Sequence, residues 1–126
     1  IKRQLPEWNL STFAQQAGIA CTGQKEYVNE SVVYVRTERK FLSDGLRELG
    51  LKAFTGEADF ILLYSELPLY EALLQKGLLI RDCSNFRGLG TGYYRIAVRT
   101  RNENERLLSE IGEWIERNRT VTTGRN

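Results

Sequence analysis

Residues 93–99 read Tyr-Tyr-Arg-Ile-Ala-Val-Arg and alternate strictly between two kinds of side chain. Because successive residues of a β-strand point to opposite faces of a sheet, this alternation predicts a strand with one packed face. We expect Tyr94, Ile96 and Val98 to pack under a helix. The other face carries Tyr93, Arg95, Ala97 and Arg99. Water or another domain must cover that second face, because the chain has few remaining residues to do so.

Helical patterns precede and follow this strand. Ser11 or Asn9 can cap a short helix, and a long helix with apolar residues at helical spacing is expected to end at Gly50. A third helix, with Leu69, Leu73 and Leu74 turned inward, is predicted between Pro68 and Gly77. A capping box at Thr100-Arg-Asn-Glu103 predicts the start of the last helix, which carries an apolar stripe on residues Leu107, Leu108, Ile111, Trp114 and Ile115.

Three further short strands are predicted, over 52–54, 60–64 and 78–81. The run Phe60-Ile-Leu-Leu-Tyr64 is wholly apolar, which favours burial on both faces of the sheet. The order of elements predicts an α+β fold, an αβ sandwich with helices over a small, mostly antiparallel sheet. We expect three regions, an N-terminal arm with a short helix at 1–23, a small domain at 24–119 that begins with a long connecting helix, and a disordered tail at 120–126.

The composition fits one soluble globular domain of 126 residues. Its 18 basic and 16 acidic residues are interspersed, which argues against binding to nucleic acid or to a membrane surface. No membrane-spanning run or secretory leader is recognisable, so a cytoplasmic location is expected. The chain starts at Ile1 and has no histidine. It therefore resembles an excised piece that lacks the side chain most often used for proton transfer near neutral pH.

The two cysteines, Cys21 and Cys83, are far apart and lie in no metal-binding motif, so neither a metal site nor a disulfide is expected. The loop Gly88-Leu-Gly-Thr-Gly92 runs into a strand and not into the start of a helix. Phosphate-binding loops depend on that helix N-terminus, so we expect this loop to be a turn.

Two arginines are the best candidates for ligand binding. Arg81 ends the strand before the glycine-rich loop, and Arg95 lies in the strand after it. If these strands are neighbours, both guanidinium groups approach one cleft, where they suit carboxylate and phosphate groups. Tyr93 is a weaker candidate on the same strand face. The alternative is that both arginines are solvated or paired with acidic side chains in a purely structural role.

The stretch Leu78-Leu-Ile-Arg-Asp-Cys-Ser-Asn-Phe-Arg-Gly-Leu-Gly-Thr-Gly-Tyr-Tyr-Arg-Ile-Ala-Val-Arg99 resembles the C-terminal signature of the fold-type-I, class I/II aminotransferase family. The resemblance extends from Pro6-Glu-Trp-Asn-Leu10 to Asn104-Glu-Arg-Leu-Leu108. It is strongest to the branch that holds histidinol-phosphate aminotransferases and threonine-phosphate decarboxylases. The Cys83 to Asn85 spacing, the Tyr93-Tyr94 pair and Arg99 favour the decarboxylase.

This resemblance implies that the chain is the C-terminal small domain of a pyridoxal-phosphate-dependent enzyme. By resemblance, Arg95 binds the substrate α-carboxylate and Arg81 the substrate phosphate. The implied reaction is decarboxylation of L-threonine O-3-phosphate to aminopropanol phosphate, for the side arm of cobalamin. Two alternatives remain, a histidinol-phosphate aminotransferase-like transaminase and a stand-alone module that binds an anionic metabolite.

The catalytic groups of the family lie upstream of the matched segment. None of the five lysines matches the Schiff-base lysine by position: Lys2, Lys25, Lys40, Lys52 and Lys76. We therefore expect no catalytic, cofactor-binding or metal-binding residue in this chain, and no activity from it alone. The implied partners are an N-terminal large domain, a second subunit in a homodimer and a small phosphorylated amino acid. Ser11 stands where relatives often have asparagine.

Overall fold

The computed structural model describes residues 10–54 and 56–123, with side chains described as far as residue 119. The chain divides into two compact units, 1–33 and 34–126, and the boundary lies inside the long helix α2 (Lys25–Glu48). These two units are groups of residues that lie close together in space, and they need not coincide with domains. The domain organisation expected from the sequence, with boundaries at 23 and 119, therefore stays a prediction.

The first unit contains α1 (Thr12–Thr22) and the beginning of α2. The hydroxyl of Ser11 accepts a hydrogen bond from the backbone N–H of Ala14 at 3.2 Å, so Ser11 is the N-cap of α1. Asn9, the alternative cap, lies outside the described residues. No residue of α1 is buried, although Phe13 and Ile19 are large and apolar.

The long helix α2 ends where its glycine signal predicts. Gly50 adopts φ +84°, a left-handed conformation that other residues rarely take. Its N–H donates to the carbonyl of Arg47 at 2.9 Å, and the N–H of Leu51 donates to the carbonyl of Leu46 at 3.0 Å. These two bonds form a Schellman motif, which satisfies the last carbonyls of the helix and turns the chain into the sheet.

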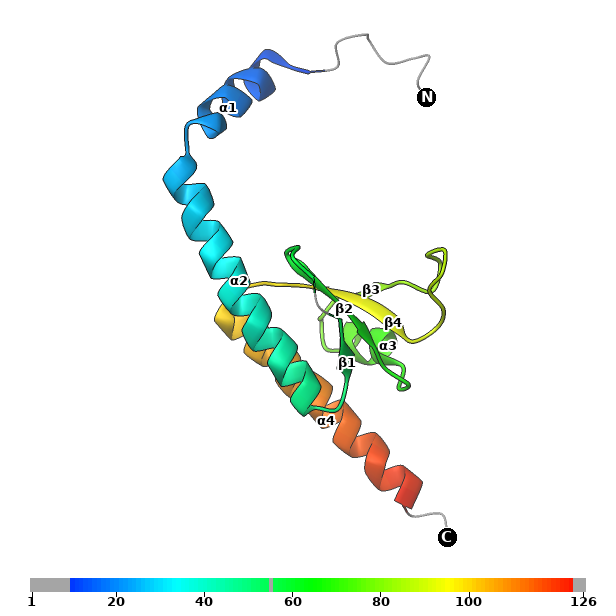
Figure 1. Cartoon of the computed structure of the whole chain (residues 1–126). Helices are drawn as coiled ribbons and strands as arrows, with labels where there is room; N and C mark the ends of the chain where they lie inside the picture. The colour runs from blue at the N-terminus through cyan, green and yellow to red at the C-terminus, as the bar shows by residue number, and fades with distance from the viewer. Residues whose placement is uncertain (1–9, 55, 124–126) are drawn as a thin grey trace, which may run out of the picture. The chain divides into compact units, whose positions relative to one another are not determined.

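The sheet has four antiparallel strands in the order β1-β2-β4-β3 (Figure 1). Their bounds are β1 (Lys52–Ala53), β2 (Phe60–Tyr64), β3 (Arg81–Asp82) and β4 (Tyr93–Ala97). The strand predicted at 78–81 is thus shorter and later than expected, and β4 ends two residues early. β4 lies in the middle of the sheet, between β2 and β3.

One face of the sheet forms the core of the second unit. Tyr94 and Ile96 of β4 are buried, as are Ile61 and Leu63 of β2. They belong to one hydrophobic cluster with residues of α2, of α3 (Leu69–Leu74) and of α4 (Arg101–Thr123), namely Leu42, Leu46, Leu69, Leu73, Leu107, Ile111 and Ile115. This confirms the α+β fold and the inward side of the 93–99 alternation.

The helices α2 and α4 run side by side behind this core and approach closely at two glycines (Figure 1). A Cβ atom at Gly45 of α2 would lie 2.5 Å from a methyl group of Leu108 in α4. A Cβ atom at Gly112 of α4 would lie 3.2 Å from a methyl group of Leu49. Gly45 therefore makes room for a leucine of the opposite helix, and Gly112 for the leucine that directly follows α2.

Two sequence expectations are wrong in detail. Phe60 is 38% exposed, so β2 is buried on one face only, because no described segment covers its other face. Leu74 is 44% exposed, because it lies about 100° around the helix from the buried Leu73. The last helix continues to Thr123 and residues 124–126 lie outside the described part, so the disordered tail expected at 120–126 stays a prediction.

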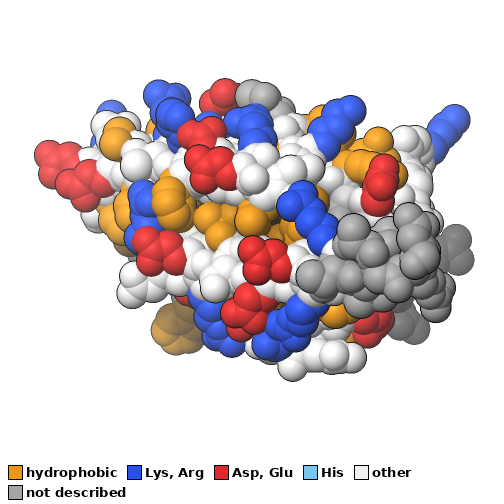
Figure 2. All heavy atoms as spheres, turned by 90° about the horizontal axis from the view of Figure 1, so that it is seen from below, with side chains coloured by type: hydrophobic (Ala, Val, Ile, Leu, Met, Phe, Trp, Pro, Cys, Tyr) orange, Lys and Arg blue, Asp and Glu red, His pale blue; other side chains and the backbone are white. Residues whose placement is uncertain are grey.

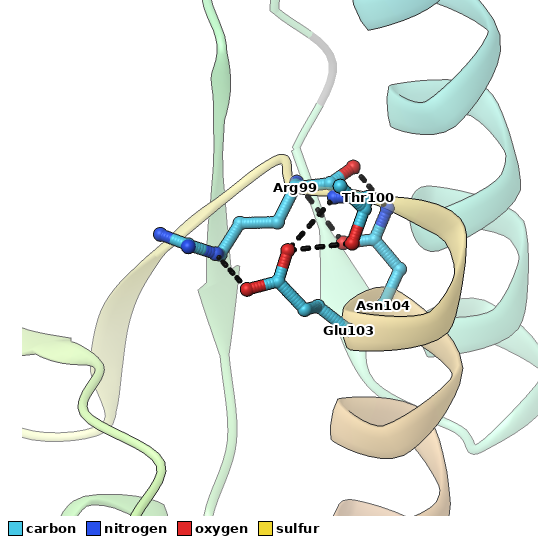
Figure 3. Close-up of polar contacts among 4 residues, drawn as sticks. All are labelled: Arg99, Thr100, Glu103 and Asn104. Carbon is cyan, nitrogen blue, oxygen red and sulfur yellow. Dashed lines mark hydrogen bonds and ion pairs between the residues drawn. The ribbon is translucent and has the colours of Figure 1, made fainter.

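Side chains at the junction of β4 and α4 bind the backbone there (Figure 3). A carboxylate oxygen of Glu103 accepts hydrogen bonds from the backbone N–H of Thr100 at 3.2 Å and from the Thr100 hydroxyl at 2.6 Å. Glu103 also pairs with Arg99 at 2.8 Å. The amide of Asn104 bonds to both the N–H and the carbonyl of Arg99, at 3.1 and 2.9 Å. One half of the expected capping box is thus present, the bond from the Thr100 N–H to Glu103, while the Thr100 hydroxyl donates to the same carboxylate.

Behind this junction, Glu38 of α2 is only 4% exposed. Its carboxylate accepts hydrogen bonds from Arg101 at 2.9 and 3.1 Å and from Asn104 at 3.0 Å. A buried carboxylate needs such partners because burial removes its hydration. This network therefore ties α2 to the first turn of α4.

We predict that Gly92→Ala destabilises the fold more than Gly88→Ala. Both glycines have positive φ, which costs alanine about 1–2 kcal/mol. A Cβ at Gly92 would also lie 2.6 Å from the Ser65 carbonyl oxygen and 2.9 Å from the Tyr64 ring, whereas nothing lies within 4 Å at Gly88. Chemical denaturation measures the free energy of unfolding of both variants. Equal losses would contradict the close approach of β2 and β4 at Gly92.

We also predict that Glu103→Gln lowers stability at neutral pH and that this difference shrinks in acid. The Thr100 hydroxyl, then Arg99 and the Thr100 N–H, hold the pKa of the Glu103 carboxyl below its ordinary value. Its stabilisation is therefore present above the unfolded pKa of about 4.3 and is lost as the pH falls through the lower folded pKa. Melting temperatures from pH 2 to 7 test this, with the exposed Glu105→Gln as control. A difference that does not change with pH would refute the prediction.

Candidate functional site

The pairing of β3 with β4 places the two candidate arginines together. Arg81 and Arg95 are direct partners in the antiparallel register, and Asp82 pairs with Tyr94. Directly paired residues of antiparallel strands point to the same face, with Cβ atoms about 4.5–5.5 Å apart. Both arginines are exposed on the sheet face opposite the core. The condition set by the sequence, that their strands are neighbours, is therefore met.

An open groove of about 800 Å³ includes both arginines. It follows the edge of the sheet along β3 and the end of β4. Its walls combine basic, acidic and apolar side chains, from Asp59, Phe60, Tyr70, Leu79, Ile80, Arg81, Asp82, Arg95 and Ala97. The groove is large enough for a small metabolite.

Among the residues that the structure describes, neither arginine forms an ion pair with a carboxylate. The guanidinium carbon of Arg95 lies 4.8 Å from the ring centre of Phe60. That of Arg81 lies 5.6 Å from the ring centre of Phe86, and one of its nitrogens donates to Asn85 at 3.4 Å. Like charges directly opposite each other destabilise a strand pair. The two guanidinium groups have no direct carboxylate partner among the described residues, although Asp59 and Asp82 also line the groove.

Tyr93 lies on the same sheet face, two residues before Arg95. Its ring packs against Tyr64, at 5.0 Å between ring centres, and against Phe54, at 6.0 Å. It does not line the groove that contains the arginines. The structure thus places Tyr93 in an aromatic cluster beside the candidate site.

The loop between β3 and β4 forms turns and starts no helix, as expected for the glycine-rich segment. Gly88 and Gly92 have positive φ, and Asp82 accepts a hydrogen bond from the Ser84 N–H at 2.8 Å. Cys83 is buried with its thiol 3.7 Å from the Arg81 carbonyl oxygen, and Cys21 is also a free thiol. In the part of the chain that the structure describes, no cluster of three potential metal ligands occurs.

Charged side chains of both signs are interspersed around a band of hydrophobic side chains on the face that Figure 2 shows.

Within residues 10–54 and 56–123, no helix combines the length and the apolar character that a bilayer-crossing helix requires.

Sequence reasoning missed four residues near the arginines. Asp59 and Asp82 line the groove, and Phe60 and Phe86 contact the guanidinium groups. Phe60 was assigned to a strand buried on both faces. The signal that reveals its place is the pairing register of β2 with β4, which single-sequence patterns do not contain.

The sequence model of the family described as aminotransferase class I and II matches residues 1–111 of this chain. The histidinol-phosphate aminotransferase of Methanothermobacter thermautotrophicus is 31% identical over an alignment of 121 residues, with 90% of this chain and 32% of that protein covered. The threonine-phosphate decarboxylase of Salmonella typhimurium is 31% identical, with 98% of this chain and 33% of that protein covered.

A solved structure, that of the histidinol-phosphate aminotransferase from Clostridium acetobutylicum, superposes with a TM-score of 0.83 and 30% identity. The superposed part covers 92% of this chain and 36% of the chain in that structure. This chain thus spans about a third of the length of the relatives that it matches. The matched residues and the shared small-domain fold show that the chain belongs to the class I and II aminotransferase family.

Proposed function

We propose that this chain is the C-terminal small domain of a pyridoxal-phosphate-dependent L-threonine O-3-phosphate decarboxylase, and that it binds the substrate by its two anionic groups. One observation carries this proposal. Arg81 and Arg95 are paired across β3 and β4 on an exposed sheet face, and neither forms an ion pair with a carboxylate of the described residues. Two adjacent guanidinium groups without a direct ion pair in the described part of the chain suit a small molecule with two anionic groups.

Arg95 is proposed to bind the α-carboxylate. A guanidinium fork binds a carboxylate through two parallel hydrogen bonds, which fix its plane as well as its position. Arg95 would thereby orient the bond that breaks when carbon dioxide leaves. Arg81 is proposed to bind the phosphate, so that binding energy from a non-reacting group holds the substrate in one pose. Tyr93, packed beside the groove, is at most a secondary contact in this proposal.

The described residues do not fit pyridoxal phosphate by themselves. Three of the described lysines have other neighbours: Lys40 pairs with Asp44, Lys76 pairs with Glu110 at 3.1 Å, and Lys52 lies 5.2 Å from the ring centre of Phe54. The glycine-rich loop leads into β4, so it lacks the helix N-terminus that binds a cofactor phosphate. In this proposal the large domain holds the cofactor, and the residues described here only bind substrate.

The names of the relatives support a second candidate, a histidinol-phosphate aminotransferase. That name belongs both to a relative with 31% identity and to the superposed solved structure. In that case Arg95 would bind the carboxylate of an amino-acid co-substrate. A stand-alone anion-binding module is the third possibility, and it requires tight binding by this chain alone. A homodimeric assembly and a cytoplasmic location are part of the enzyme proposal.

The first test uses the full-length protein that contains this chain, reconstituted with pyridoxal phosphate. We predict that it releases carbon dioxide from O-phospho-L-threonine without any keto acid. Arg95→Ala should lower kcat/KM roughly 100-fold or more, because two charge-assisted hydrogen bonds are lost. Arg81→Ala should lower it roughly 10- to 100-fold, mainly through phosphate binding.

The control for this test is Arg87→Ala, which removes an exposed arginine of the neighbouring loop. It should leave kcat/KM within about twofold if position, and not net charge, is what matters. Turnover of histidinol phosphate only with 2-oxoglutarate, and no release of carbon dioxide, would assign the aminotransferase reaction instead.

We further predict that the 126-residue chain does not form a stoichiometric lysine adduct with pyridoxal phosphate and does not turn over substrate. The reason is that its described lysines have other neighbours or lie apart from the arginine groove. Absorbance titration near neutral pH measures the adduct. Saturable formation of one adduct per chain would contradict the placement of the cofactor site in the large domain.

A further inference from the structure

We propose that Phe60 and Phe86 are positioning residues that hold Arg95 and Arg81 by the faces of their rings and leave the guanidinium N–H groups free for an anion. The inference rests on the proposed function of the two arginines and adds residues to the site. Neither phenylalanine touches the substrate in this proposal. Each acts through the arginine that it holds.

Phe60 has no role in the core that would explain an aromatic ring at this place. It lies on the outer face of β2, is 38% exposed, and pairs with Ala97 across β4. Arg95 is the partner of Leu62, so Phe60 lies diagonally across from it. The distance of 4.8 Å from the guanidinium carbon to the ring centre is within the range of cation–π attraction.

An aromatic ring and a carboxylate hold an arginine side chain in different ways. All five N–H donors of a guanidinium lie in its plane, so a partner on its face occupies none of them. A carboxylate partner would accept those hydrogen bonds and neutralise the charge, and an incoming anion would have to displace it. A phenylalanine therefore restricts the arginine while its donors and its charge remain available.

The two rings come from different segments of the chain. Phe60 is in β2, on the side of β4 away from β3, whereas Phe86 follows β3 in the loop. Asn85 accepts a hydrogen bond from Arg81 on that same side. Each arginine is therefore held by a different segment, Arg95 by β2 and Arg81 by the loop.

Arg101 provides a contrast within the same chain. Its guanidinium carbon lies 3.6 Å from the ring centre of Phe41, but it also pairs with the buried Glu38 at 2.9 Å. Its charge is compensated, and it connects α2 to α4. Arg101, which contacts both a ring and a carboxylate, is therefore a structural arginine. Arg95 and Arg81 differ from it because each contacts a ring and pairs with no carboxylate of the described residues.

The first experiment follows the Arg95 side chain by NMR in the ¹⁵N-labelled 126-residue chain, without ligand. In the wild type we expect the Arg95 Nε–H resonance at a ring-shifted position. Phe60→Leu keeps the apolar bulk and should move this resonance to the position of a free arginine, whereas Phe60→Tyr should restore it. The matched control, Phe41→Leu, should move the Arg101 resonance and leave that of Arg95 unchanged. Unchanged backbone amide shifts in β4 show that each variant is folded.

The second experiment measures the dissociation constant for O-phospho-L-threonine in the full-length protein. Phe60→Leu should weaken binding by roughly two- to fivefold, which corresponds to one exposed cation–π contact. Phe60→Tyr should bind like the wild type, and Arg95→Ala should bind far more weakly. Phe86→Leu should have a comparable effect on Arg81.

The outcomes separate this inference from the proposed function. An Arg95 resonance that is the same in the wild type and in Phe60→Leu overturns the positioning role, whatever binds. A ring-dependent resonance in a protein whose affinity does not change in Arg95→Ala supports the positioning role and overturns the proposed substrate contact. Loss of affinity in Arg95→Ala but not in Phe60→Leu leaves the substrate contact intact and overturns the inference.

Discussion

The register between β3 and β4 decides where the two arginines of the groove lie. It makes Arg81 and Arg95 direct partners, and the register of β2 with β4 brings Phe60 to the same face. Because side chains alternate along a strand, a slip of one residue would turn Arg95 into the core and Ile96 into the groove. The buried Tyr94 and Ile96 prevent that slip, since exposing them would cost the contacts of the inner face. Core packing and ligand geometry therefore depend on the same backbone pairing.

Arginines in this chain have two kinds of environment, and the difference separates folding from binding. At the junction of α2 and α4, Arg101 is paired with the buried Glu38, and Asn104 satisfies the remaining carboxylate oxygen. On the outer face of the sheet, Arg95 has an aromatic ring in place of a carboxylate. The first arrangement contributes to a connected core. The second leaves the hydrogen-bond donors of the arginine without a direct carboxylate partner among the described residues, so that they are available to an anionic ligand.

Local patterns in the sequence predicted the features that depend on local forces. The alternation at 93–97, the glycine at 50 and the Thr100–Glu103 cap were all recovered, because each follows from neighbouring residues. The apolar run 60–64 predicted burial on both faces of the sheet, and this prediction was wrong. An apolar sequence does not show whether another segment of the chain covers each face. Strand position and the family resemblance singled out Arg81 and Arg95, whose role in substrate binding stays a prediction, whereas Phe60 required the pairing register. Contacts between strands that are far apart in the sequence produce no repeating pattern of residues in either strand.

The two edges of the sheet have a consequence for how this chain behaves among copies of itself. Each edge strand has only two residues, Lys52–Ala53 at one edge and Arg81–Asp82 at the other, and each carries a cation. Short edges with charged side chains offer little backbone for another strand to extend, and they discourage sheet-to-sheet growth into aggregates. Arg81 thus has a second effect that is independent of any ligand. It protects an open sheet whose outer face no segment of the described chain covers.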